Sequence, residues 1–519
     1  MSADAVAALV HEQYVRLPKT GKPQPGEWTV LSGVVLVRPS AEPEVVALGT
    51  GTKCLTASQI AADEAGEMLH DSHAEVCARR ALVSYLMAEL HTLLHGAESA
   101  VLEPRTVDAA GLVGGFALRP GVEMHFYTSE PPCGDAAIFA LAVDGTDGGE
   151  PQDEAVDPSA SLPPAPKRPR STQCSEAAGV AAGLQRRTGA RPASASAMAA
   201  EEASGGTECG LGLVRTKPGR GERTCCMSCS DKLSRWTALG VQGSLLSLLI
   251  PEPICFKSIT VSSPCSLAAL RRALSRSQPF TDCHATFTHA NPVGDRLRRE
   301  EGPPCEQHAP AEAPPQLRRT SVRFCDGPPA SSAAQTATAL PDQPSTSPTA
   351  DGLSRPCSNS LVWAACGLSE AVNGLSGKKL GANKRMPSPK HRSATCKAVR
   401  LARFLELLRS LPDEAIAPEL IKVMRTAMAH KEEAHAATPA SDRDGSAEAN
   451  RVDASGSHAQ VDVCGTDSLC PTYASLKAAS LSYQQRKAAL LQEGRPLADW
   501  LKAPASCERF WITAHAPQK

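Results

Sequence analysis

The stretch Asp71-Ser72-His73-Ala74-Glu75 and the residues directly after it decide the fold class. The stretch is predicted to lead into an α-helix, because apolar side chains recur downstream at a spacing that gives a helix one buried face. These side chains are Val76, Val83, Leu86 and Leu90. A helix of this kind needs a sheet or other helices to cover it.

Strand signals occur on both sides of this helix. Residues 28–37 and 45–48 are rich in β-formers and are separated by turn residues, which predicts a hairpin. Residues 124–128 are predicted to form a strand that ends at the turn Pro131-Pro132-Cys133-Gly134, with a helix following through Ala140. Further helices are predicted from Cys229 through Leu233 and Trp236, over 399–408 and over 476–491. The pattern indicates one α/β domain with a mixed sheet and flanking helices.

Three segments lack the apolar periodicity that offsets the entropy of ordering a chain. The chain has 519 residues, 42 Pro and 38 Gly, with only 4% aromatic residues, so part of it is not expected to join a core. We predict disordered insertions at 144–182, 300–356 and 434–465.

Composition excludes several protein classes. Asp4, His11, Glu12 and Arg16 interrupt the N-terminal segment, so it does not resemble a signal peptide, and no apolar run is long enough to span a membrane. We therefore expect an intracellular protein, nuclear or cytoplasmic, whose 19 cysteines are thiols or metal ligands. The net charge of −1 says little, but residues 371–403 carry Lys and Arg without Asp or Glu. This run is either a solvated loop or a nucleic-acid contact.

His73, Glu75 and Cys133 are a candidate metal site and its base. Together with Pro132 they match most of the signature H-x-E then P-C-x-x-C of the zinc deaminases. Three ligands leave one tetrahedral position for water, whose pKa zinc lowers to roughly 7. Glu75 is then expected to move protons without binding the metal. The alternative is a capping box, because Ser72-x-x-Glu75 starts helices in many proteins.

The third ligand cannot be chosen from spacing. Ala136 stands where the signature has its second cysteine, so a ligand must come from elsewhere in the chain. Cys225, Cys226 and Cys229 are all candidates. A separate site built on Cys226 and Cys229 is a further alternative.

Several motifs, in order along the chain, resemble the adenosine deaminases that act on RNA. They are Gly49-Thr50-Gly51-Thr52-Lys53-Cys54, Asp71-Ser72-His73-Ala74-Glu75, Pro218-Gly219-Arg220-Gly221-Glu222-Arg223-Thr224, Met227-Ser228-Cys229-Ser230-Asp231-Lys232 and Gly240-Val241-Gln242-Gly243-Ser244. The resemblance implies a cytidine-deaminase-like sheet, zinc bound by His73, Cys133 and Cys229, and Glu75 as the proton shuttle. It implies one deaminase domain over residues 1–519, interrupted by the insertions.

Two further motifs resemble the tRNA-specific branch of that family, namely residues 17–23 and 187–190. The deaminase pattern also begins close to Met1, which leaves no room for duplex-RNA-binding domains. The implied reaction is hydrolytic deamination of adenosine to inosine in tRNA, at the adenosine 3′ of the anticodon in tRNA for alanine. A deaminase of other structured RNA or of cytidine, and a non-catalytic RNA-binding scaffold, are the alternatives. No obligate protein partner is evident.

The resemblance also implies inositol hexakisphosphate inside the fold. The residues that match its binding positions are Arg79, Arg80, Lys232, Arg235, Trp236, Lys397, Tyr473, Lys477, Tyr483, Lys487 and Trp500. Cations buried together need dense negative charge to balance them. Asp71 and Lys232 are expected to link this anion toward the metal, while His70 departs from the Asn often found there.

The expected RNA contacts are Thr52 and Lys53 near the target nucleotide and Val30 in the lining of its pocket. These also rest on the resemblance. A valine in a predicted strand is more often ordinary core, so Val30 has that alternative.

Overall fold

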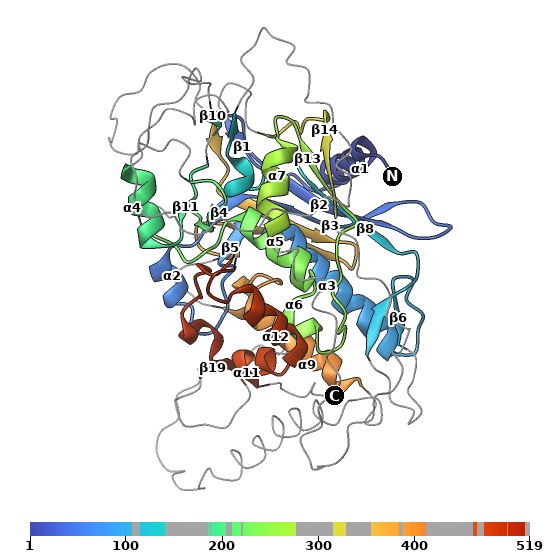
Figure 1. Ribbon diagram of the computed structural model, residues 1–519. Helices are drawn as coiled ribbons and strands as arrows, with labels where there is room; N and C mark the ends of the chain where they lie inside the picture. Colours follow the sequence, from blue (N-terminus) through green and yellow to red (C-terminus); the bar gives the residue numbers. More distant parts are fainter. Residues whose placement is uncertain are drawn as a thin grey trace, which may run out of the picture.

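A mixed eight-stranded β-sheet lies at the centre of the computed structural model (Figure 1). The structure describes residues 1–105, 115–140, 185–186, 188–203, 210–218, 222–276, 315–327, 354–382, 388–411, 460–463, 472–495 and 497–513. The strand order is β14 (Gln316–Thr320), β13 (Ser258–Ser262), β8 (Glu123–Thr128), β2 (Leu31–Val37), β3 (Glu44–Thr50), β16 (Asn359–Ala364), β17 (Leu368–Asn373) and β18 (Lys378–Lys379). The first three strands are parallel to one another, and from β8 to β18 each neighbouring pair is antiparallel.

Helices cover both faces of this sheet. Val35 of β2 packs with Val10 of α1 (Ala3–Arg16) on one face. Val34 points to the other face and belongs to the larger core with α3 (Ala74–Leu94). This is the alternation that a strand imposes on its side chains, and it places the start of α3 against the middle of the sheet.

The remaining elements pack around α3 and the sheet. The helices are α2 (Ala57–Ala61), α4 (Ala195–Ala203), α5 (Cys229–Leu239), α6 (Gly243–Leu246), α7 (Leu267–Leu274), α9 (Lys397–Arg409), α11 (Tyr473–Ala478) and α12 (Leu481–Leu490), with short 3-10 turns η1 (Asp135–Ala137), η3 (Pro389–His391) and η5 (Ala505–Glu508). Two-stranded pairs are β1 (Glu27–Trp28) with β15 (Arg355–Pro356), β4 (Thr52–Cys54) with β5 (Asp71–His73), β6 (Leu102–Pro104) with β7 (Phe116–Leu118), β9 (Phe139–Ala140) with β10 (Gln185–Arg186), β11 (Arg191–Pro192) with β12 (Arg215–Thr216), and β19 (Gln460–Val463) with β20 (Phe510–Thr513). Figure 1 shows α11 and α12, in red, gathered beside α6 and α9.

Most of the predicted elements are confirmed. The β2–β3 hairpin, the strand β8 and the helices α3, α5 and α9 lie where the sequence patterns place them, and the α/β class with a mixed sheet is correct. All four predicted core positions of α3 are buried.

Two predicted helices differ from the structure. The helix expected through Ala140 is wrong, because η1 spans only three residues and Phe139 then pairs with Arg186 in a short β-ladder. The helix expected over 476–491 is two helices, separated at Ala479 and Ser480. Apolar residues continue across both places, but pairing with residues 185–186 replaces the first helix, and Ala479 and Ser480 separate the other two.

Two of the three predicted insertions contain strands, so their predicted bounds are too wide. Residues 144–182 lie outside the described residues. Within 300–356, however, β14 pairs with β13 at the edge of the central sheet, and β15 pairs with β1. Within 434–465, β19 pairs with β20. β14 reads Gln-Leu-Arg-Arg-Thr, and an edge strand with so few apolar residues gives little sequence signal.

In the described part of the chain, every helix is too short or too polar to cross a bilayer.

A candidate metal centre beside a buried cationic cluster

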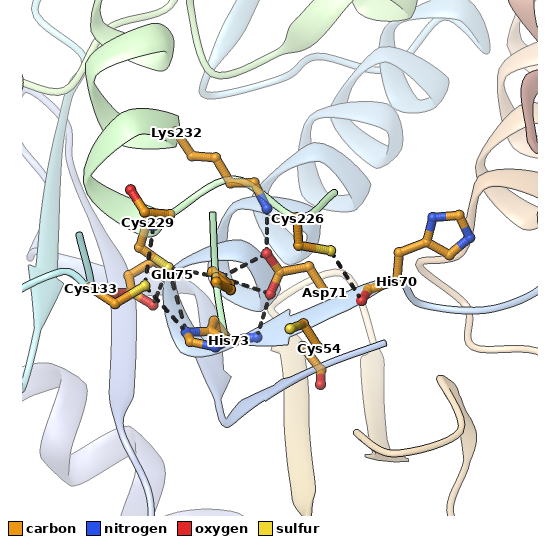
Figure 2. Close-up of polar contacts among 12 residues, drawn as sticks. Cys54, His70, Asp71, His73, Glu75, Cys133, Cys226, Cys229 and Lys232 are labelled. Carbon is orange, nitrogen blue, oxygen red and sulfur yellow. Dashed lines mark hydrogen bonds and ion pairs between the residues drawn. The ribbon is translucent and has the colours of Figure 1, made fainter. Parts of the chain in front are cut away.

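One imidazole and two thiols converge at the start of α3 (Figure 2). Nδ1 of His73 lies 3.8 Å from Sγ of Cys133 and 3.7 Å from Sγ of Cys229. The potential ligand atoms all lie within 4.8 Å of one another. His73 ends β5 and caps α3, Cys133 lies in the turn after β8, and Cys229 is the first residue of α5.

The two cysteine segments are joined by direct contacts. The backbone N–H of Cys229 donates to Sγ of Cys133 at 3.3 Å, and Ser230 donates from both its backbone and its hydroxyl to the carbonyl of Cys133 at 3.0 Å. Gly134 has φ of 108°, and a Cβ there would lie 2.3 Å from the hydroxyls of Ser228 and Ser230. Glycine is therefore required for the two segments to approach this closely.

The donor set fits zinc. One imidazole nitrogen and two cysteine sulfurs, held by three separate elements, match the donor set of catalytic zinc sites, which have three protein ligands and a fourth position for solvent.

Glu75 lies beside these ligands without being one of them. Its Oε2 is 3.1 Å from Sγ of Cys229, and its side chain is buried at the first turn of α3. Burial, followed by the nearby Cys133 sulfur, raises the pKa of Glu75 above its ordinary value. A carboxylate with a raised pKa is suited to accepting and releasing a proton near neutral pH.

The capping-box alternative does not hold. The N-cap of α3 is His73, and its side chain makes no capping hydrogen bond. Ser72 lies one residue too early and donates its hydroxyl to the carbonyl of Lys53 at 3.0 Å. Glu75 is therefore free of the helix-capping role that its spacing from Ser72 allowed.

Sequence reasoning missed Lys217, which lies directly behind the candidate metal centre. Its side chain is 0% exposed, and Nζ donates to the two carboxylate oxygens of Asp71 at 2.9 and 2.7 Å and to Sγ of Cys229 at 3.2 Å. Lys232 also contacts this carboxylate. Burial opposes the charged carboxylate, but Lys217 and Lys232 hold the pKa of Asp71 well below its ordinary value. A single lysine in a polar segment carries no sequence signal of burial.

The other candidate cysteines lie apart from the ligands. Cys226 packs with Cys54, Cys225 and Cys507 in a small apolar cluster, and its thiol donates to the carbonyl of His70 at 3.6 Å. Among the described residues, the group able to hold a metal contains Cys229 and neither Cys225 nor Cys226. The structure therefore gives no support to a separate Cys226/Cys229 site.

A second group, the cationic cluster, is formed by basic and aromatic side chains from α3, α5, α9, α11 and α12 and by Trp500, which follows α12. It comprises Arg79, Arg80, Arg235, Trp236, Lys397, Arg400, Tyr473, Lys477, Tyr483, Lys487 and Trp500. Arg79 stacks over Trp236, and Arg235 stacks over Trp500 and approaches the hydroxyl of Tyr483 at 3.5 Å. Arg400 also belongs to this cluster, although it is not among the positions predicted from the sequence.

The cations of this cluster destabilise one another. Burial, and then Arg400, lowers the pKa of Arg79 to about 9. Burial, and then Arg235 and Lys477, lowers the pKa of Lys487 to about 8. Nε of Arg400 is buried without a hydrogen-bond partner. An unpaired buried cation is costly, so this cluster fits a bound polyanion.

Three acidic side chains pair with basic side chains in the cluster or close to it in the sequence pattern. Glu508 pairs with Lys477 at 2.6 Å and lies 4.0 Å from Lys397. His70, the residue that departs from the family pattern, bonds Asp63 at 2.7 Å. Lys232 contacts Asp71, as expected for a residue between the cluster and the metal centre.

The three expected RNA-contact residues lie near one another beside His73. Thr52 pairs with His73 across the β4–β5 ladder, and Lys53 follows it on β4. Val30 lies between β1 and β2 rather than in a strand, is half-buried, and accepts a hydrogen bond from Gly51 at 3.1 Å. The expectation of a strand position for Val30 is therefore wrong, and its partial exposure leaves room for a pocket contact.

Comparisons with known proteins agree with this geometry. A tRNA-specific adenosine deaminase 1 from Mus musculus is 33% identical over 349 residues, which cover 53% of this chain and 68% of that protein. The Drosophila melanogaster protein of the same name is 35% identical over 286 residues, 55% of this chain and 60% of its own. A double-stranded RNA-specific editase from the same fly is 32% identical over 264 residues, 50% of this chain and 33% of its own. Residues 47–504 match the adenosine-deaminase (editase) domain, and the chain therefore belongs to that family.

Proposed function

We propose that this protein deaminates adenosine to inosine in tRNA, using zinc held by His73, Cys133 and Cys229. Water is consumed and ammonia is released, while the purine ring gains a carbonyl oxygen at C6. Bound zinc would activate a water molecule at neutral pH by lowering its pKa. The position of Glu75 next to Cys229, inside the site but outside the ligand triad, is the observation that supports catalysis most strongly.

Glu75 would carry the protons of this reaction. Its carboxylate would accept one proton from the water and deliver it to the ring nitrogen N1. It would then take the second proton from the new hydroxyl at C6 and pass it to the amine that leaves as ammonia. The same position argues against a non-catalytic scaffold, because a scaffold has no use for a carboxylate buried beside the metal ligands.

Replacing Glu75 tests this assignment. Glu75→Ala is expected to abolish inosine formation and to leave zinc bound, whereas His73→Ala loses both zinc and activity. Zinc content is measured by atomic emission, and inosine by nuclease digestion and mass spectrometry. Substantial activity in Glu75→Ala, or zinc loss equal to that of His73→Ala, would contradict the proposed roles.

The substrate we propose is the adenosine 3′ of the anticodon in tRNA for alanine. The names of the similar proteins and the motifs at residues 17–23 and 187–190 support tRNA. An unpaired loop adenosine also costs less to flip into a pocket than one in a duplex. Incubation with total tRNA, long duplex RNA and cytidine, followed by sequencing of inosines, separates the alternatives. Efficient editing of duplex RNA with unmodified tRNA would exclude the tRNA assignment and leave the chemistry intact.

We also propose that inositol hexakisphosphate occupies the cationic cluster. The unpartnered Nε of Arg400 and the lowered pKa values of Arg79 and Lys487 support an anion with several charged groups. Arg79, Arg80, Lys397, Lys477 and Lys487 would hold its phosphates.

A further inference from the structure

Each cysteine of the candidate metal centre is followed, two residues later, by a buried aspartate. Asp135 follows Cys133 and Asp231 follows Cys229, and the side chains of both aspartates are 0% exposed. Buried carboxylates require partners. Both partners come from one short segment, α7 and the turn directly after it.

Arg272 of α7 fixes the segment that carries Cys133. Its Nε donates to the two carboxylate oxygens of Asp135 at 3.2 and 3.1 Å. Its Nη2 donates to the backbone carbonyls of Asp135 and Ile138 at 2.8 and 2.9 Å. One guanidinium therefore holds both the side chain and the backbone of this turn.

Arg276 ties the segment that carries Cys229, through the side chain of Asp231, to the backbone at Gly212. Its Nη2 contacts Asp231 at 2.6 Å, and its Nη1 donates to the carbonyl of Gly212 at 2.9 Å. The second carboxylate oxygen of Asp231 accepts from the hydroxyl of Ser228, the N-cap of α5. The N–H of Gly212 in turn donates to Asp135 at 2.8 Å, so the two contacts form one connected network.

The arrangement compensates for a missing motif. In a C-x-x-C turn the backbone of a single turn fixes the separation of two thiolates, but Ala136 replaces the second cysteine here. Cys229 lies 96 residues after Cys133, so tertiary contacts must set their separation. Arg272 lies on α7 and Arg276 lies in the turn directly after it, and each contacts the aspartate of one cysteine segment.

We propose that Arg272 and Arg276 are positioning residues that brace the two cysteine segments and set the thiolate separation for zinc. The inference rests on the zinc centre of the proposed function. Groups that hydrogen-bond to the segments carrying metal ligands contribute strongly to metal affinity. Their loss typically weakens metal binding by about 10- to 100-fold.

Arg272→Gln and Arg276→Gln test the proposal, with Arg271→Gln as the matched control. Arg271 lies on the same helix with an exposed side chain. We expect each of the first two variants to bind Zn²⁺ about 10- to 100-fold more weakly in competition with a chromophoric chelator. The thiolate-to-cobalt and d–d absorption bands of Co²⁺-substituted protein should shift, whereas Arg271→Gln should match the wild type.

These measurements separate positioning from simple stabilisation. A structural ion pair alone would lower the unfolding midpoint and leave the cobalt spectrum and the zinc affinity of the folded protein unchanged, and that result overturns the proposal. If the glutamine variants do not fold, Arg272→Lys and Arg276→Lys keep the charge but lose the forked contacts. Weaker zinc binding by the lysine variants supports the proposal, and wild-type affinity overturns it. A wild-type chain that binds neither metal would overturn the zinc centre itself.

Discussion

Lys217→Met is expected to destabilise the protein more than most surface substitutions can. Methionine has a similar length but cannot donate to Asp71 or Cys229, which Lys217 contacts in three hydrogen bonds. Removing one partner of a buried ion pair costs about 3–5 kcal/mol, because the other charge stays buried. Lys232 remains in contact with Asp71 and is 16% exposed, so we expect about 3 kcal/mol, the lower end.

The assay is urea unfolding of zinc-loaded protein, followed by tryptophan fluorescence. Lys257→Met is the matched control, because Lys257 pairs with Glu123 at 3.2 Å and the two side chains are 52% and 40% exposed. Such a pair contributes less than about 1 kcal/mol. A loss in Lys217→Met no larger than in Lys257→Met would refute the reasoning.

Two further predictions concern the cysteines and the cationic cluster. Cys229→Ser should deplete zinc far more than Cys226→Ser, because Cys226 packs with Cys54 outside the ligand triad, and equal depletion by metal analysis would contradict this. Purified protein should release inositol hexakisphosphate on denaturation, detected by mass spectrometry, and Arg400→Gln should retain less of it. An active preparation without the anion would contradict that assignment.

The sequence predicted the elements whose signals are local. The helix α3 and the hairpin of β2 and β3 carry periodic apolar residues, and each has one face in the core. The strand β14 was missed because its place at the edge of the sheet demands few apolar residues. The helix expected through Ala140 was wrong because pairing with a distant segment ended it.

The candidate site shows the same division. His73 and Glu75 are two residues apart, so their relation could be predicted from spacing. Spacing could not distinguish Cys229 from Cys226 as a ligand, because the two cysteines are only three residues apart and the sequence does not reveal which thiol faces His73. Lys217 was missed for a related reason, since its burial depends on Asp71, 146 residues away.

Lys217 and Arg79 are both buried, but their pKa values shift in opposite directions. Burial alone lowers the pKa of a lysine or an arginine. Asp71 and the sulfur of Cys229 outweigh this effect at Lys217, whose pKa is raised well above its ordinary value. Near Arg79 the dominant neighbour is another cation, Arg400, and the pKa falls to about 9. The charges behind the metal centre are therefore balanced within the chain, whereas the basic side chains of the cationic cluster outnumber Glu508, the carboxylate that pairs with Lys477 and lies near Lys397. An added polyanion would therefore stabilise the cationic cluster and leave Lys217 and its partners nearly unchanged. For this reason we expect the polyanion to bind at the cationic cluster.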